Sequence, residues 1–275
     1  MACDSPLIIE VKGRISKIPV PCGKCPPCKL RRINDWVFRL KQEDKVSSSS
    51  CFITLTYDTK NVPISGNGFM SLRKRDWQLF MKRLRKQSPN KLKYYACGEY
   101  GSTTKRPHYH AILFNCTDTE LIEKSWGLGS IHVGTATGDS MAYCLKYINK
   151  EAVIPQHARD DRVKEFSNQS KNLGVSYLSD AVKAFHRSNP NDLRVQNNDY
   201  KIAMPKYYRY KIFDENERRQ QLPSIKSAVD LTELENLLTF EKRGYTQHYD
   251  DYKFNKKVGR YKTHYSQTNQ KRNTI

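Results

Sequence analysis

The sequence lacks any run of about 18 apolar residues, so no part of it predicts a membrane-spanning helix. It also lacks a Gly-rich phosphate loop of the Walker type, which argues against an ATP-driven motor. Its first residues show no basic start followed by an apolar stretch, so we predict no secretory signal. We therefore expect a protein of the reducing cytoplasm, with no membrane partner and with cysteines that are free thiols or metal ligands rather than disulfides.

Apolar residues are also scarce, at 37% of the 275 residues. This length allows one large core, and the low apolar share indicates that the core carries long polar extensions. The signals weaken beyond residue 150, and the last thirty or so residues are basic and aromatic with almost no aliphatic side chains. We expect this tail to be flexible, or ordered only on nucleic acid.

Positive charge is abundant: 48 Lys and Arg face 28 Asp and Glu, for a formal net charge of +20. A polyanion is the expected partner of such a chain. The 17 tyrosines add rings that stack on bases, which favours single-stranded nucleic acid over a lipid surface.

Strand and helix patterns alternate irregularly, with short turns between them, which predicts an α+β fold with a mostly antiparallel sheet. The expected strands are residues 51–58, 91–101, 108–114 and 130–133, and the expected helices are 73–87, 118–126 and 138–150, the last capped by Asp139 or Ser140. The helix at 73–87 has one apolar face and is otherwise almost entirely basic. We predict DNA contacts for Arg73, Lys74, Lys82, Arg83 and Arg106.

Two histidines flank one tyrosine in the strand pattern "RPHYHAILF". His108 and His110 are two residues apart, so their side chains share one face of a strand. Glu99, in the preceding strand of a predicted hairpin, comes near them. Two imidazoles and one carboxylate leave positions open for substrate oxygens at a catalytic divalent cation. The alternatives are histidines that hydrogen-bond in a core, and a non-haem iron oxygenase site, although the charge favours a phosphodiester substrate.

The stretch "AYCLKYINK" repeats Tyr-x-x-Lys twice, as Tyr143 with Lys146 and Tyr147 with Lys150. At about 100° per residue these four side chains share one side of a helix, opposite the aliphatic ones. A phenol, with a pKa of about 10, is a poor nucleophile unless a metal polarises the phosphate and lysines stabilise the phenolate. Two tyrosines suit a reaction that cuts and later rejoins a strand, although an ordinary surface helix has the same pattern.

Three cysteines in "PCGKCPPC" have the spacing C-x2-C-x2-C. With Cys3, the residues Cys22, Cys25 and Cys28 give the four thiolates of a structural zinc site. An iron–sulfur cluster is a rival, but the further Cys followed by Pro that it calls for is absent. Free thiols in a turn are the simplest alternative.

Three motifs in order resemble those of the HUH endonucleases, and of microvirus replication initiators of the gokushovirus kind in particular: "FITLTYD", "HYH" and "YCLKYINK". "PCGKCPPC", "GEYG" and "MPKYYRYK" resemble that group too, and the likeness covers roughly residues 1–210. It implies a five-stranded antiparallel sheet flanked by helices, with the metal histidines on a central strand and Glu99 as the carboxylate ligand.

The resemblance also implies a rolling-circle replication initiator in the cytoplasm of a bacterial host. Such an enzyme nicks one origin strand with Mg²⁺ or Mn²⁺, becomes joined to the 5′ phosphate through tyrosine, and leaves a 3′ hydroxyl as primer. No helicase motif follows, so a host helicase and DNA polymerase are the expected partners. We expect a Cys-rich module with a basic helix at 1–45, a nuclease domain at 50–212 and a basic, partly flexible extension at 213–275. A non-enzymatic DNA- or RNA-binding protein is the alternative.

Overall fold

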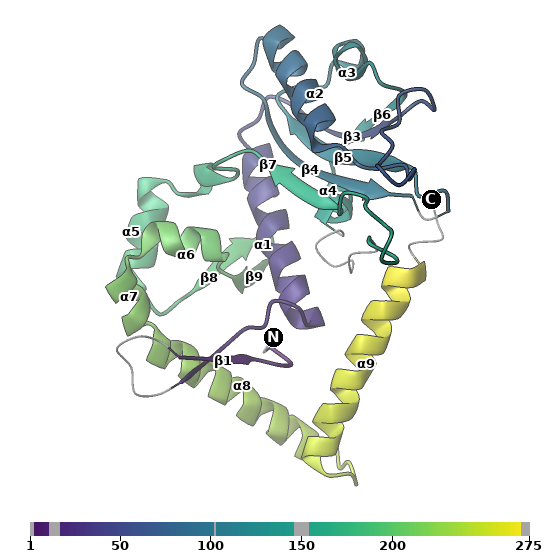
Figure 1. Ribbon diagram of the computed structural model, residues 1–275. Coiled ribbons are helices and arrows are strands. Elements are labelled where there is room, and N and C mark those ends of the chain that lie inside the picture. Colours follow the sequence, from purple (N-terminus) through teal and green to yellow (C-terminus); the bar gives the residue numbers. More distant parts are fainter. Residues whose placement is uncertain (1–2, 11–16, 102, 146–153, 271–275) are drawn as a thin grey trace. The chain divides into compact units, whose positions relative to one another are not determined.

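The computed structural model describes residues 3–10, 17–101, 103–145 and 154–270 (Figure 1). The chain divides into two compact units. The sheet unit comprises Trp36–Tyr177, and the terminal unit joins Met1–Asp35 to Leu178–Gln270. Helix α1 (Pro26–Asp44) begins in the terminal unit and ends in the sheet unit.

A five-stranded antiparallel sheet forms the centre of the sheet unit, with the order β6-β3-β5-β4-β7. Its strands are β3 (Ser50–Thr56), β4 (Lys93–Tyr100), β5 (Pro107–Phe114), β6 (Ile131–Thr135) and β7 (Phe166–Gln169). Every residue of the middle strand, β5, is buried. The predicted α+β fold with a five-stranded antiparallel sheet and flanking helices is therefore confirmed.

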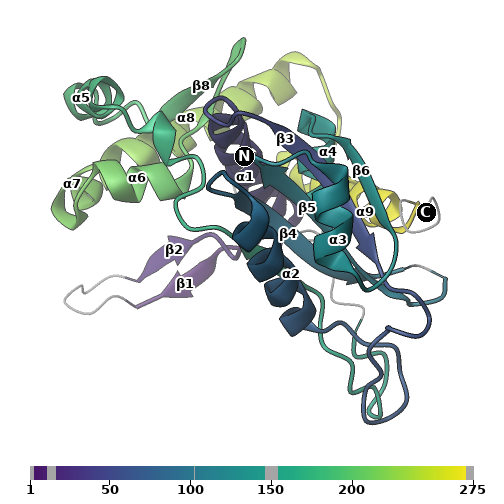
Figure 2. The ribbon, with the colours of Figure 1, turned by 90° about the horizontal axis from the view of Figure 1, so that it is seen from above.

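Helices α2 (Lys74–Gln87) and α3 (Thr119–Trp126) lie together on one face of this sheet (Figure 2). The apolar stripe predicted for the first of them is buried, and the ring of Trp77 packs against those of Tyr94 and Tyr109 in the sheet. This layer holds the main hydrophobic core, because the alternate residues Ile53 and Leu55 of β3 point into it, together with rings from both helices.

The opposite face of the sheet meets α4 (Gly138–Leu145) and the second half of α1. Trp36 of α1 packs on Tyr95, and the buried carboxylate of Glu43 accepts hydrogen bonds from Lys93 and from the backbone N–H of Gly174. In α4 the side chains of Met141, Cys144 and Leu145 are buried, as the helical pattern predicted.

The cap of α4 differs from the prediction of Asp139 or Ser140. Thr137 precedes the helix, and its Oγ1 accepts the N–H of Ser140 at 3.1 Å while its own N–H donates to Ser140 Oγ at 2.7 Å. This reciprocal pair is a capping box, so the helix begins earlier than a cap at Asp139 or Ser140 would allow.

The terminal unit contains two small hairpins and five helices in its described residues. The hairpins are β1–β2 (Leu7–Ile9, Ile18–Val20) and β8–β9 (Arg194–Asn197, Tyr200–Ala203), and the helices are α5 (Asp180–Ser188), α6 (Lys206–Ile212), α7 (Glu215–Gln220), α8 (Leu222–Lys242) and α9 (Tyr249–Gln270). A single-turn helix, η2 (Val175–Tyr177), ends the sheet unit. None of the helices in these described ranges combines the length and apolarity needed to cross a bilayer.

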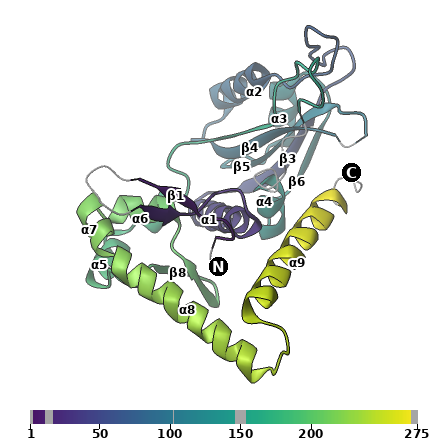
Figure 3. The ribbon, with the colours of Figure 1, turned by 60° about the horizontal axis from the view of Figure 1, so that its bottom comes forward.

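Two features of the terminal unit were not anticipated from the sequence. The compact sheet unit ends at Tyr177, inside the range 50–212 predicted for the nuclease domain, because α5 and α6 pack on one another and Arg187 donates to the carbonyl of Ile212. The tail expected to be flexible contains α9, which diverges from α8 after a short turn (Figure 3). Aromatic packing replaces the missing aliphatic residues: Phe240 of α8 contacts Tyr249 and Tyr252 of α9.

Candidate active site and metal-ligand clusters

Glu99, His108 and His110 converge on the sheet face that α4 covers. Glu99 and His108 are direct partners in the β4–β5 register. The Oε1 atom of Glu99 lies 2.9 Å from His108 Nε2 and 2.8 Å from His110 Nε2. The side chains are almost buried, with residue exposures of 1% for Glu99, 8% for His108 and 5% for His110. One atom of each can reach a single cation.

The remaining ring nitrogens of both histidines are engaged, which orients their Nε2 atoms toward the carboxylate. His108 Nδ1 lies 3.1 Å from the carbonyl oxygen of Arg106. His110 Nδ1 lies 2.9 Å from Thr54 Oγ1 on β3. Partners of this kind fix the tautomer and ring orientation of metal-binding histidines.

Charge pairing dominates the electrostatics of the cluster. Burial alone would raise the pKa of Glu99, but the hydrogen bonds with His108 and His110 outweigh it and lower that pKa to about 2. The carboxylate is therefore ionised at neutral pH, as a cation ligand must be. Two nitrogens and one carboxylate oxygen on one side of a site match a divalent cation with open positions for substrate oxygens.

Tyr143 of α4 packs against the histidine pair. Its ring meets that of His110 edge to face, at 5.2 Å between centroids, and that of Phe52 at 5.9 Å. Phe52 in turn stacks on His110 at 5.6 Å. One of the two predicted tyrosines is thus beside the candidate metal ligands.

The other predicted members of the tyrosine helix, Lys146, Tyr147 and Lys150, lie outside the described residues.

The five predicted DNA-contacting residues are not together. Arg73, Lys74, Lys82 and Arg83 belong to or adjoin α2, which packs on the sheet face opposite the histidines. Arg73 pairs with Asp76 through both carboxylate oxygens, and Arg83 donates to the carbonyls of Ser125 and Trp126 at the end of α3. Lys74 and Lys82 are exposed. Arg106 alone of the five adjoins the histidine pair, since its carbonyl oxygen orients His108.

Thr54 and Phe52 were not predicted as site residues. Both lie on β3, and Thr54 is the direct register partner of His110. Alternation along the strand "FITLTYD" places Phe52, Thr54 and Thr56 on one face. This alternation contains the signal, but it needs the pairing of β3 with β5, which the strand patterns alone do not specify.

A second cluster lies in the terminal unit, where Cys3, Cys22, Cys25 and Cys28 come together with all four sulfurs within 4.8 Å of one another. The Sγ atoms of Cys3 and Cys25 are 3.8 Å apart, which is far longer than a disulfide bond. In a tetrahedron with metal–sulfur bonds of about 2.3 Å, two sulfurs are separated by about 3.8 Å. The predicted convergence of these four residues is therefore present.

Backbone N–H groups surround the sulfurs of this cluster. Cys22 donates to Cys3 at 3.3 Å, and Cys25 and Lys24 donate to Cys22 at 3.3 and 3.4 Å. The last two lower the pKa of the Cys22 thiol to about 6, whereas burial raises the pKa of Cys28 to about 12. Gly23, with φ of 72°, supplies the left-handed residue of the turn.

Comparisons with known proteins agree with the sequence motifs. Residues 50–152, which include both the histidine pair and Tyr143, match a family model of replication-associated proteins, described by the name ORF2. The chain is a relative of phage replication-associated proteins. The predicted resemblance to microvirus replication initiators is thereby confirmed.

Three curated phage proteins are similar to this chain. The replication-associated protein VP4 of Bdellovibrio phage phiMH2K is 29% identical over 52% of this chain and 51% of its own length. The replication-associated protein ORF2 of Spiroplasma virus 4 is 26% identical over 72% of this chain and 68% of its own length. The replication-associated protein ORF4 of Chlamydia phage 1 is 23% identical over 70% of this chain and 53% of its own length. The alignments thus span about half the length of two of these relatives. No solved structure matches the chain.

Proposed function

We propose that this protein is a rolling-circle replication initiator: a metal-dependent endonuclease of the HUH type that nicks one DNA strand at a specific site and later rejoins strands. The observation that carries the proposal is the contact of Tyr143 with His110, inside a cluster whose three ligand atoms converge. The similarity to phage replication-associated proteins supports a role at a replication origin.

Glu99, His108 and His110 are the proposed ligands of Mg²⁺ or Mn²⁺. Their geometry fits such an ion, because the two Nε2 atoms face one ionised carboxylate while both Nδ1 atoms are engaged elsewhere. A bound divalent cation would polarise the scissile phosphate. Buried ligands with fixed rings favour one orientation of the phosphate relative to Tyr143.

Tyr143 is the proposed nucleophile of the first half-reaction, with Tyr147 as its counterpart for rejoining. The phenolic oxygen forms a bond to phosphorus while the bond from phosphorus to the 3′ oxygen breaks. The phenol loses its proton, the 3′ oxygen gains one, and the 5′ phosphate remains on the protein as a phosphotyrosine. Lys146 and Lys150 are proposed to stabilise the phenolates. Attack by the second tyrosine or by a 3′ hydroxyl reverses the step without an external energy source.

We also propose that the cysteine cluster binds a structural Zn²⁺, and that the domains follow the predicted division into a Cys-rich module, a nuclease domain and an extension. The proposed partners are origin DNA, a host helicase and a host DNA polymerase in the bacterial cytoplasm. Arg106, beside the histidines, is the proposed DNA contact nearest the reaction. Proposed contacts by Arg73, Lys74, Lys82 and Arg83 would involve DNA that reaches the far face of the sheet.

The test uses labelled, tiled single-stranded oligonucleotides from the DNA that carries the gene, with Mg²⁺ or Mn²⁺. We expect a denaturation-resistant adduct at the 5′ phosphate, lost when Tyr143 and Tyr147 are both changed to Phe. The alternative, a non-enzymatic DNA- or RNA-binding protein, is consistent with the net charge of +20. It predicts binding without an adduct. An oxygenase would instead turn over a small molecule with iron.

A further inference from the structure

The segment Cys3–Ser5 connects the cysteine cluster to α9 within the terminal unit. Cys3 lies in the cluster through its sulfur, which accepts the N–H of Cys22 at 3.3 Å and lies 3.8 Å from Cys25 Sγ. The backbone of the next residue, Asp4, hydrogen-bonds the Cys25 thiol. The position of Asp4 is thus set from the cysteine side.

Asp4 also holds α9 through both its carbonyl and its carboxylate. Lys257 Nζ donates to the carbonyl oxygen of Asp4 at 3.0 Å and lies 3.5 Å from Ser5 Oγ. Arg260 pairs with the Asp4 carboxylate, whose side chain is only 5% exposed. A buried carboxylate is stable only while its cationic partner remains in place, so this pair ties the helix to the segment.

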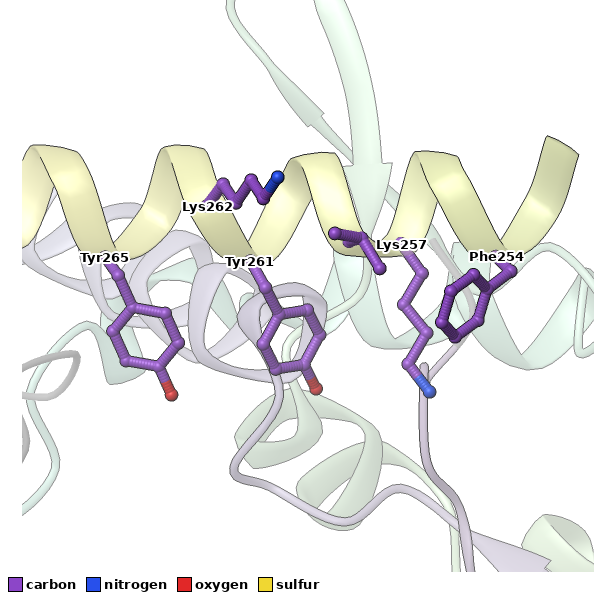
Figure 4. A pocket seen from close by; sticks show the side chains of 6 residues that line it. Phe254, Lys257, Tyr261, Lys262 and Tyr265 are labelled. Carbon is purple, nitrogen blue, oxygen red and sulfur yellow. The ribbon is translucent and has the colours of Figure 1, made fainter. Parts of the chain in front are cut away.

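Lys257 and Arg260 are three residues apart, so both reach Asp4 from one side of the helix. Phe254, Lys257, Tyr261 and Tyr265 extend from one side of α9 and, with Val258 and Lys262, line a shallow pocket (Figure 4). The lysine that holds Asp4 is therefore also a wall of this pocket. Any movement of Asp4 changes the pocket as well as the helix.

No regular secondary structure holds residues 3–5, because β1 begins only at Leu7. Their position depends on Cys3, and the position of the Cys3 sulfur depends on whatever joins the four cysteines. We propose that Zn²⁺ bound by Cys3, Cys22, Cys25 and Cys28 fastens α9 through Asp4, so that α9 is a metal-dependent element. This inference rests on the zinc site proposed above and is independent of DNA nicking.

The experiment measures metal and amide exchange on the full-length protein. Elemental analysis should find about one zinc per chain, and replacement by Co²⁺ should give the thiolate charge-transfer absorption of a four-sulfur site. Removing zinc with a chelator should speed hydrogen exchange in α9 by about tenfold or more, while α5 in the same unit changes little. Iron with labile sulfide, or no bound metal, would overturn the zinc site.

Asp4→Asn separates the fastening from the metal, because all four cysteines remain. We expect zinc to be retained and α9 to exchange about as fast as in the chelated protein. Glu10→Gln is the matched control, since Glu10 is an exposed acid of the same N-terminal segment that pairs with Lys17 instead. Zinc that is bound but has no effect on α9 exchange, or an Asp4→Asn protein with wild-type exchange, would overturn the fastening and leave the nicking proposal untouched.

Discussion

Thr54→Val removes the hydroxyl that orients His110 while keeping the shape of the side chain. The hydroxyl lies 2.9 Å from His110 Nδ1 and is the contact that holds this nitrogen from β3. His108 is oriented by a backbone carbonyl, which a substitution of this side chain does not remove. The change therefore loosens one of the two proposed histidine ligands and leaves the other in place.

The expected loss follows from this single contact. Removing partners of metal-binding histidines reduces metal affinity or activity by about 10- to 100-fold, and one hydrogen bond contributes about 0.5–1.5 kcal/mol. Because one of two orienting contacts is lost and Val fills the same volume, we expect the lower end. The metal concentration for half-maximal nicking should rise about tenfold, which is about 1.4 kcal/mol.

The assay is a metal titration of nicking, together with calorimetric titration of Mn²⁺ into the DNA-free protein. Thr54→Ser should restore the wild-type midpoint because it restores the hydroxyl. Thr56→Val is the matched control: it is the same substitution two residues further on the same strand, but the Thr56 hydroxyl bonds Ser130. Unchanged metal midpoints for Thr54→Val in both titrations would refute the orienting role.

Three further predictions concern the site and the stability of the fold. Changing His108 and His110 together to Ala should abolish nicking while leaving salt-dependent DNA binding largely intact, as measured by adduct formation and by fluorescence anisotropy. Arg83→Ala should lower the free energy of unfolding by about 1–3 kcal/mol, because two carbonyls at the end of α3 lose their donor, whereas the exposed Lys82→Ala should change it little in the same urea titration. Burial lowers the pKa of His186, so the unfolded chain binds a proton below pH about 6.5 that the folded chain does not. Stability should therefore fall as the pH drops from about 7.5 to about 5.5, and His186→Leu should flatten this slope; an equal slope in both proteins would contradict the assignment.

The sheet and the metal ligands could be predicted because their signals are local. Residues two apart on a strand share a face, and a short hairpin brings Glu99 to His108 with little freedom of register. The helical pattern of α4 likewise identified its buried side, with Cys144 and Leu145 fully buried. In each case the spacing along the chain was enough to determine the neighbour in space.

Other features depend on contacts between distant segments, which spacing does not encode. The basic helix α2 has the pattern of a DNA-binding surface, but only the packing of Trp77 shows that it covers the face away from the histidines. The helix α9 is poor in aliphatic residues, yet it packs through tyrosines on Phe240 and through Lys257 and Arg260 on Asp4. Thr54 needed the β3–β5 register before its role could be seen.

The most direct test of the central claim is the chemical identity of the adduct. Protein incubated with Mn²⁺ and labelled single-stranded DNA is digested, and the peptide that retains the nucleotide is sequenced by mass spectrometry. The proposal predicts a 5′-phosphotyrosine at Tyr143 in the first turnover, absent from the Tyr143→Phe protein at the same time point. DNA binding with no covalent peptide, or an adduct on a residue outside α4 and the tyrosine repeat that follows it, would contradict it.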